Sequence, residues 1–220
     1  MKIKLAVFDF DGTLFDSMYV WDTAGERYLR SLGKTPSPDL REDLKTLSLY
    51  QAAEYFISEY GVGLTPDEVV AGINLTVEQA YVNDVLPKAG VEAFLKELKS
   101  DGTTLCIATA TDRYPIEAAL KRCGMEQYFD AIFTCSEVGH GKDAPIIFRR
   151  AMEHFGADRG STLVFEDALH AAQTAKSDGF RVVAVYDPSE KQQTELRRIA
   201  DFCLDSFENT QDLRKYASAL

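Results

Sequence analysis

Two aspartates near the start of the chain stand one residue apart, directly after a short apolar run. The run 3–8 has strand length and β-branched residues, which predicts a buried strand that ends in a turn at Gly12. Because side chains alternate along a strand, Asp9 and Asp11 are expected to leave it on the same side. Two carboxylates at the end of a buried strand repel each other and are costly to desolvate. A divalent cation held by oxygen ligands would compensate them, although Asp and Gly also occur together in ordinary turns.

Hydroxyl, amine and carboxylate side chains follow later apolar runs. One predicted strand ends at Thr109, another runs into Glu166 and Asp167, and Lys142 stands at the start of a predicted helix. Taken singly, each has a commonplace explanation as a turn residue, a helix cap or a solvated lysine. Together with the first two aspartates they form a set suited to Mg²⁺ and a phosphoryl group. A carboxylate in such a set can also act as the nucleophile and form an aspartyl-phosphate that water then cleaves.

Strand and helix patterns alternate from Pro87 onwards. Apolar strands are predicted at 104–109, 131–134, 162–165 and 181–185, and helices at 89–99, 114–123, 143–155, 168–177 and 190–200. This alternation predicts a parallel sheet with helices on both faces. Right-handed crossovers bring the carboxyl ends of the strands to one edge, where the sites of such sheets lie. The expected fold class is therefore α/β, with a doubly wound parallel sheet as its core.

The segment 16–83 differs from the rest of the chain because its apolar residues recur at helical spacing. Glycines and prolines break the pattern into several helices, and the last of them begins with a capping box at Thr65 and has Pro66 at its first position. We therefore expect a helical domain, 16–83, inserted into a catalytic core domain formed by 1–15 and 84–220.

Composition narrows the classes of partner. The net charge of −11 argues against nucleic acid, because phosphate backbones are bound by clustered Lys and Arg. The four cysteines are scattered without Cys-x-x-Cys spacing, which favours reduced thiols in the cytoplasm. No signal peptide and no apolar run of membrane-spanning length is recognisable. We expect a cytoplasmic protein that binds no membrane, with a monomer as the default state.

The order of these motifs resembles the haloacid dehalogenase-like hydrolases, in the subfamily that carries a helical cap of the C1 type after the first motif. The resemblance covers nearly the whole chain and rests on four segments, Phe8–Thr13, Ile107–Thr111, Gly141–Pro145 and Phe165–Asp167. It implies a Rossmann-like core with an inserted α-helical cap domain. It also implies a phosphoric monoester hydrolase that uses Mg²⁺.

Residue roles follow from the same resemblance. Asp9 would be the nucleophile, and Asp11 would be the general acid and base. The phosphoryl group would be held by Thr109, Ala110 and Lys142. Mg²⁺ would be bound by Asp9, the backbone carbonyl of Asp11, and Asp167, with Glu166 acting through water. Asp11 favours phosphate-ester chemistry over dehalogenation, because a halide leaves without a proton.

The cap most resembles that of β-phosphoglucomutases and related sugar-phosphate phosphatases. Substrate specificity is expected from five cap residues, Met18, Trp21, Ser48, Leu49 and Tyr50. Trp21 and Tyr50 could stack on a sugar or a base, or Trp21 could belong to the core of the cap. A mutase must grip a second phosphate with cationic groups, yet Leu49 stands where the mutase carries Arg, and Val77 stands near its cap Lys.

These departures favour a Mg²⁺-dependent phosphatase of small phosphomonoesters, such as a sugar phosphate, over a phosphosugar mutase. A non-catalytic protein that binds phosphorylated metabolites is a third interpretation. The intact set of carboxylates, hydroxyl and lysine argues against it, because binding alone does not need a nucleophile and a general acid.

Overall fold

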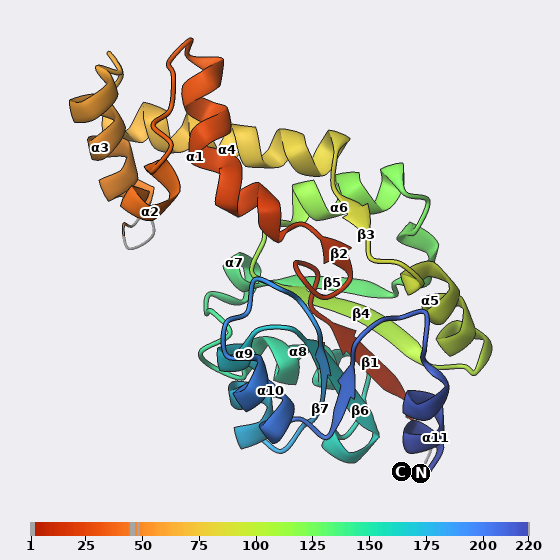
Figure 1. Cartoon of the computed structure of the whole chain (residues 1–220). Coiled ribbons are helices and arrows are strands. Elements are labelled where there is room, and N and C mark those ends of the chain that lie inside the picture. The colour runs from red at the N-terminus through yellow and green to blue at the C-terminus, as the bar shows by residue number, and fades with distance from the viewer. Residues whose placement is uncertain (1–2, 45–46, 48, 220) are drawn as a thin grey trace. The chain divides into compact units, whose positions relative to one another are not determined.

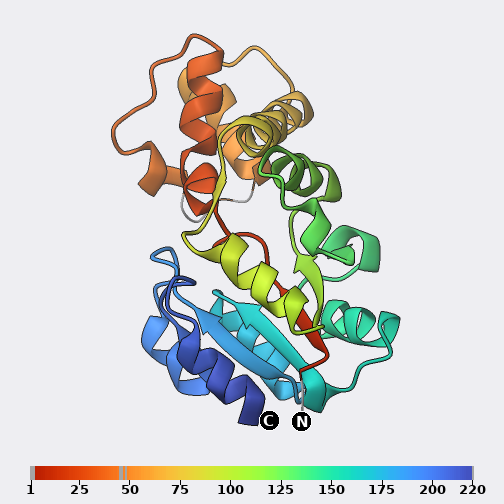
Figure 2. The same cartoon turned by 90° about the vertical axis from the view of Figure 1, so that its right-hand side faces the viewer.

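The chain forms two compact units, which are described separately. The computed structural model describes residues 3–44, 47 and 49–219. The core unit comprises Met1–Asp16 and Val85–Leu220, and the helical unit comprises Ser17–Asp84. The core unit holds a β-sheet flanked by helices, whereas the described part of the helical unit contains helices and connecting loops (Figures 1 and 2).

Six parallel strands form the sheet of the core unit, in the order β5-β4-β1-β6-β7-β8. Their bounds are β1 Leu5–Phe8, β4 Thr104–Thr109, β5 Ala131–Thr134, β6 Thr162–Glu166, β7 Arg181–Val185 and β8 Phe202–Leu204. The strand β1 lies between β4 and β6, and Phe8 is in register with Ile107 and Phe165. The predicted parallel α/β fold is thereby confirmed, and the first motif lies at the centre of the sheet.

Helices cover both faces of this sheet. The helices of the core unit are α5 Val91–Ser100, α6 Arg113–Arg122, α7 Cys135–Val138, α8 Ile146–His154, α9 Leu169–Ser177, α10 Gln193–Ile199 and α11 Gln211–Ala219, with short 3₁₀ turns at Glu126–Tyr128 and Arg159–Ser161. On one face, Val7 belongs to a buried cluster with residues of α8, α9 and α10. On the other, Phe8 stacks on Phe165 at 4.3 Å between ring centroids and packs edge-on against Phe94 of α5. Alternating side chains of β1 therefore fill two separate apolar layers.

The predicted helix 143–155 begins later than expected. The helix α8 starts at Ile146, with Pro145 at its N-cap, so Lys142 lies in a turn before the helix and not at its start. A residue that precedes a proline is disfavoured in helical conformation. Ala144, which precedes Pro145, therefore stays outside the helix, as does Lys142 in the turn before it.

The chain passes between the core unit and the helical unit twice, and the two segments next to these boundaries pair in a second, two-stranded sheet. The strand β2, Phe15–Asp16, pairs antiparallel with β3, Leu86–Pro87. Backbone hydrogen bonding continues beyond the pair, because the Lys88 N–H donates to the Leu14 carbonyl at 2.9 Å. Strands of two residues carry no periodicity, and this sheet was not predicted.

Four helices make up the described part of the helical unit: α1 Met18–Ser31, α2 Leu40–Leu44, α3 Leu49–Tyr60 and α4 Pro66–Asn83. The predicted capping box at the start of α4 is present, because Thr65 Oγ1 accepts from the Glu68 N–H and Glu68 accepts from the Thr65 N–H at 2.8 Å. Tyr28 and Phe56 stack at the centre of the unit, and Gly72 leaves the space that the Tyr28 ring occupies.

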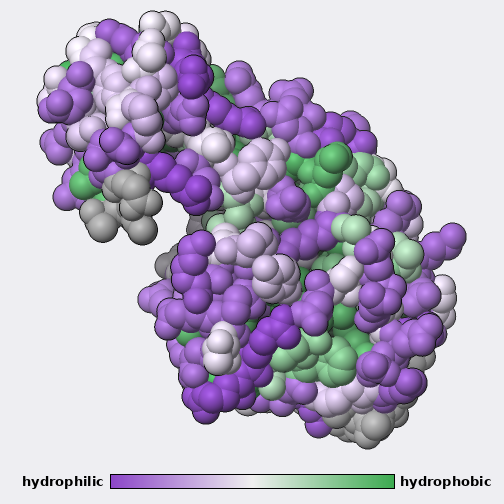
Figure 3. Space-filling model, in the orientation of Figure 1, coloured by the Kyte–Doolittle hydropathy of each residue, from purple (hydrophilic) through white to green (hydrophobic). Residues whose placement is uncertain are grey.

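The face drawn in Figure 3 is mainly hydrophilic, with hydrophobic residues in scattered patches. No helix in the part of the chain that the structure describes combines the length and apolar composition needed to cross a membrane.

Candidate active site

The predicted site residues of the core unit meet at the carboxyl edge of its three central strands. Asp9 follows β1 directly, and its backbone N–H donates to the Phe165 carbonyl on β6 at 3.0 Å. Thr109 is the last residue of β4, and Glu166 is the last residue of β6. Because β1 pairs with both β4 and β6 in parallel register, these three strand ends are necessarily neighbours.

Lys142 connects two of the predicted carboxylates. Its ammonium group pairs with Asp9 Oδ1 and donates to Glu166 Oε1 at 2.6 Å. All three side chains are buried. Burial alone would lower the pKa of Lys142, but the charges of Asp9 and Glu166 outweigh it and raise the pKa above its ordinary value. Lys142 is therefore a charged ammonium group placed beside the proposed nucleophile.

The carboxylates nevertheless outnumber the cation. Burial raises the pKa of Asp9 to about 6, with Lys142 opposing and Glu166 adding to the rise. Burial, followed by the charges of Glu166 and Asp9, raises the pKa of Asp167 well above its usual range. Ligand oxygens of Asp9, Glu166 and Asp167 lie within 4.8 Å of one another. Buried carboxylates that converge in this way and lack compensating charge fit a divalent cation with oxygen ligands.

Thr13 and Gly12 position Asp167, although neither was assigned a role from the sequence. Thr13 is completely buried, and its hydroxyl donates to Asp167 Oδ1 at 2.8 Å. Gly12 has a φ of +75°, and a Cβ built there would stand 2.3 Å from Asp167 Oδ2. The loop after β1 therefore approaches Asp167 so closely that only glycine fits. The Asp-Gly-Thr sequence indicated a turn at Gly12. It could not indicate that the partner of this turn is Asp167, which stands 154 positions after Thr13.

Asp11 is held from the end of β4. The Thr111 hydroxyl donates to Asp11 Oδ2 at 2.6 Å, and the Thr111 N–H donates to Thr109 Oγ1 at 3.1 Å. Ala110, between the two threonines, is exposed. Thr111 was noted in the second motif, but it was not among the predicted site residues.

The predicted specificity residues belong to the helical unit. Trp21 on α1 is 46% exposed and its Nε1–H donates to the Tyr81 hydroxyl at 3.1 Å, so the alternative that Trp21 is core is wrong. Met18 is half-buried, while Leu49 and Tyr50 are exposed at the start of α3. Ser48 lies outside the described residues. Val77 is buried within the unit and so cannot present a group to a substrate.

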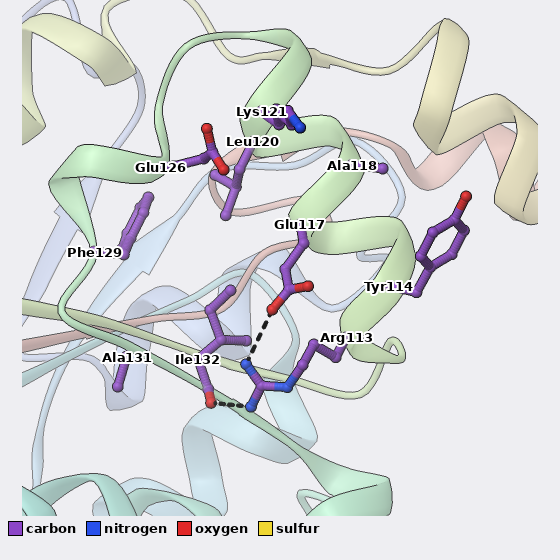
Figure 4. Close-up of a pocket in the computed structure, with 10 residues that line it drawn as sticks. All are labelled: Arg113, Tyr114, Glu117, Ala118, Leu120, Lys121, Glu126, Phe129, Ala131 and Ile132. Atoms are coloured by element: carbon purple, nitrogen blue, oxygen red, sulfur yellow. Dashed lines mark hydrogen bonds and ion pairs between the residues drawn. The ribbon is translucent and has the colours of Figure 1, made fainter.

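A separate pocket lies between α6 and β5, away from the predicted residues of the core unit (Figure 4). Its volume is about 560 Å³, and Arg113 is its most connected polar group. The Arg113 guanidinium donates to the Ile132 carbonyl at 2.7 Å and to Glu137 at 2.6 and 2.9 Å, and it contacts Glu117 at 3.4 Å. Because these contacts already satisfy the guanidinium, we assign no ligand to this pocket.

Comparisons with known proteins agree with the geometry of the core unit. The family model described as haloacid dehalogenase-like hydrolase matches residues 6–185. A Drosophila melanogaster protein named "Probable pseudouridine-5'-phosphatase" is 29% identical in an alignment that covers 94% of each chain. The "(DL)-glycerol-3-phosphatase 1, mitochondrial" of Arabidopsis thaliana is 27% identical over 93% of this chain and 70% of its own.

A solved structure has the same fold. CbbY from Rhodobacter sphaeroides, crystallised in complex with phosphate, superposes with a TM-score of 0.75 and 23% identity. The match covers 95% of this chain and 96% of CbbY. At this level of identity the likeness concerns the fold, and the chemistry has to be argued from the residues of the site.

Proposed function

Because the chain belongs to the haloacid dehalogenase-like hydrolases, we propose that it hydrolyses small phosphate monoesters through a covalent phosphoryl group on Asp9. The observation that carries the proposal is the lysine shared between two carboxylates: Lys142 pairs with Asp9 and with Glu166 at the carboxyl edge of the sheet. A cation at this position offsets part of the negative charge around Asp9 and attracts an anionic phosphoryl group.

Two half-reactions divide the work between the aspartates. In the first, a carboxylate oxygen of Asp9 attacks phosphorus, the ester P–O bond breaks, and Asp11 gives its proton to the leaving alkoxide. In the second, Asp11 takes a proton from water, whose oxygen attacks phosphorus and releases inorganic phosphate and the Asp9 carboxylate. One water is consumed, and both aspartates return to their starting states. The Lys142 ammonium and the Thr109 hydroxyl donate to the phosphoryl oxygens, with backbone N–H groups at Ala110 and the loop after β1 as further donors.

The acidic cluster suits Mg²⁺. We assign Asp9, Asp167 and the backbone carbonyl of Asp11 as ligands, with Glu166 acting through water. The surplus of buried carboxylates and their raised pKa values support this assignment. When bound, the cation screens Asp9 from the anionic substrate and stabilises negative charge on the phosphoryl oxygens. Thr13 holds Asp167 in place for that role.

The charges of the helical unit favour a phosphatase over a phosphosugar mutase. Residues 17–84 contain five basic and eleven acidic side chains. Each basic side chain in the described part has a partner: Arg27 with Asp84, Arg30 with Glu26, Arg41 with Asp22, and Lys34 with the Gly61 carbonyl. Lys45 lies outside the described residues. A unit with this balance is poorly equipped to grip the second phosphate of a bisphosphate intermediate.

Substrate selection is assigned to the helical unit, through Met18, Trp21, Leu49 and Tyr50, together with Ser48, which lies outside the described residues. The phosphatases named for pseudouridine 5′-phosphate and glycerol 3-phosphate act, by their names, on esters of uncharged alcohols. An acidic helical unit with exposed aromatic residues suits the same class of ester, including sugar phosphates. We further propose a cytoplasmic monomer without nucleic-acid or membrane partners, which light scattering and cell fractionation can test.

The decisive experiment measures phosphate released from a panel of phosphorylated metabolites in the presence of Mg²⁺. Turnover is expected on at least one neutral-alcohol ester and is expected to be lost in Asp9→Asn. Acid-quenched protein should contain phosphorylated Asp9. For the alternative, a sugar 1-phosphate is supplied with a bisphosphate activator. Formation of the 6-phosphate isomer without free phosphate would establish a mutase and overturn the proposal.

A further inference from the structure

We propose that Thr111 is a positioning residue that holds the Asp11 carboxyl group in one orientation through both proton transfers. The inference rests on the proposed function and extends it to a residue that touches neither the phosphoryl group nor the cation in that scheme. Its central observation is the 2.6 Å hydrogen bond from the Thr111 hydroxyl to Asp11 Oδ2. The bond connects residues that stand 100 positions apart in the chain.

Strand pairing brings Thr111 to Asp11. The strand β4 runs parallel to β1, with Ile107 in register with Phe8, so the segments that leave the two strands start side by side. The turn after β4 is then fixed locally, because the Thr111 N–H donates to Thr109 Oγ1 at 3.1 Å. Thr111 therefore approaches Asp11 from a position that the sheet and a local hydrogen bond define.

The same local bond orients Thr109. Its oxygen accepts from the Thr111 N–H, which leaves the Thr109 hydroxyl hydrogen for an acceptor such as a phosphoryl oxygen. The segment 109–111 thus connects Thr109, the proposed hydrogen-bond donor to the phosphoryl group, with Asp11, the proposed general acid and base. The bond to Thr109 uses the Thr111 backbone N–H, so a change of the Thr111 side chain leaves that bond in place.

The bond to Asp11 does not have to break during the reaction. As a carboxylate, Asp11 accepts the Thr111 hydrogen at Oδ2. As a carboxylic acid, it can carry its proton on Oδ1 while the carbonyl oxygen Oδ2 continues to accept. A free Asp side chain has a broad preference at its terminal torsion, so an anchor of this kind reduces the orientations that Asp11 samples. Proton transfer requires the donor within hydrogen-bond reach of the leaving oxygen.

Two variants and two substrates separate positioning from general damage. Thr111→Val removes the hydroxyl and keeps the side-chain shape, while Thr111→Ser keeps the hydroxyl. The substrates are an alkyl phosphate, whose leaving oxygen needs a proton, and p-nitrophenyl phosphate, whose leaving group departs without one. Steady-state kcat/KM reports formation of the phosphorylated enzyme, and single-turnover decay reports its hydrolysis.

For Thr111→Val we expect kcat/KM on the alkyl ester to fall about tenfold and kcat/KM on the aryl ester to stay within about twofold. Hydrolysis of the phosphorylated enzyme should slow about tenfold whichever ester formed it, because Asp11 must then act as a base. Thr111→Ser should restore both. Asp11→Asn should show the same selectivity with a larger loss.

Equal losses on the two esters, or no loss on either, would overturn the positioning role and leave the proposed function standing. A failure of Thr111→Ser to restore the alkyl ester would also overturn it, since the hydroxyl would then not be the operative group. If the unaltered protein turned over neither ester nor any member of the panel, the proposed function would fail, and this inference with it.

Discussion

Lys142 Nζ lies 2.6 Å from Glu166 Oε1 while it also pairs with Asp9, so the proposed nucleophile and its neighbour share a single ammonium group. The sharing has a consequence during turnover. In the proposed mechanism Asp9 loses its carboxylate charge when it carries the phosphoryl group, but Glu166 still holds Lys142 beside it. The lysine is thereby retained for the second half-reaction.

Replacement of Lys142 by Met should reduce phosphate release at least about 100-fold, because a preorganised charge beside the phosphoryl group is removed. Mg²⁺ should also stabilise this variant against thermal unfolding more than it stabilises the unaltered protein, since the carboxylates of the acidic cluster lose their nearest cation. Thermal unfolding with and without Mg²⁺ measures the second effect. The control is Lys176→Met, which breaks a partly exposed pair with Asp201 elsewhere and should change neither quantity. Near-normal turnover in Lys142→Met would contradict the scheme.

Thr13→Val should weaken Mg²⁺ binding about tenfold, because groups that orient a metal ligand contribute on this scale. Its hydroxyl donates to Asp167 Oδ1 at 2.8 Å inside the core unit. Thr13→Ser keeps the donor and should bind Mg²⁺ as the unaltered protein does. Titration calorimetry gives the affinity directly, and equal affinity in the Val variant would remove Thr13 from the metal site.

Gly12→Ala and Gly124→Ala form a matched pair. Both glycines have positive φ, so each substitution should cost about 1 kcal/mol of stability through the backbone. Only at Gly12 does the new Cβ meet a side chain, Asp167 Oδ2 at 2.3 Å, whereas nothing lies within 4 Å at Gly124. Urea denaturation should therefore show the larger loss in Gly12→Ala, and phosphatase activity should disappear in that variant alone. Full activity in that variant would mean that Asp167 can move without consequence.

Asp187→Asn should destabilise the core unit by about 3 kcal/mol at pH 7, because it leaves Lys88 without its carboxylate. Asp187 is almost fully buried and lies 2.9 Å from Lys88 Nζ. Burial raises the pKa of Asp187, but the hydrogen bonds from Ser189 and Lys88 lower it by a larger amount. The pKa of Asp187 therefore lies below its usual value. A lowered pKa contributes stability above the unfolded-state pKa, and this contribution is lost as the pH falls through the folded-state value.

The difference between the unaltered protein and Asp187→Asn should therefore shrink in acid, which urea denaturation at pH 7 and near pH 3 can follow. Asp205→Asn is the control, since its pair with Arg197 is exposed and should contribute less than about 1 kcal/mol at either pH. A difference that grew in acid would show that folding raises the pKa of Asp187 and does not lower it.

Much of the core unit was predictable because apolar runs marked its strands and polar residues marked their ends. Parallel pairing then required Asp9, Thr109 and Glu166 to be neighbours. The contacts of Thr13 with Asp167 and of Thr111 with Asp11 were not predictable, since they join loops whose paths depend on tertiary packing.

The start of the helix after Lys142 was predicted too early. The apolar spacing of α8 was extended back to residue 143, although Pro145 marks the start of the helix more reliably than periodicity does. The exposure of Trp21 is a second case. The sequence left open whether Trp21 belongs to the core of the cap, and the structure leaves it 46% exposed while its indole N–H donates to the buried Tyr81 of α4. Whether a helical residue is covered depends on its packing against other elements.

The paired strands β2 and β3 bear on how such a protein can be rebuilt. Asp16 and Leu86 are partners in this short ladder, so the helical unit is spliced into the core at a single paired stem. An insertion whose two ends are already side by side can be exchanged, shortened or replaced by a brief turn without re-routing the central sheet. Specificity and chemistry can then diversify at different rates within one gene, and a chimaera joined at this stem is a practical way to transplant substrate preference.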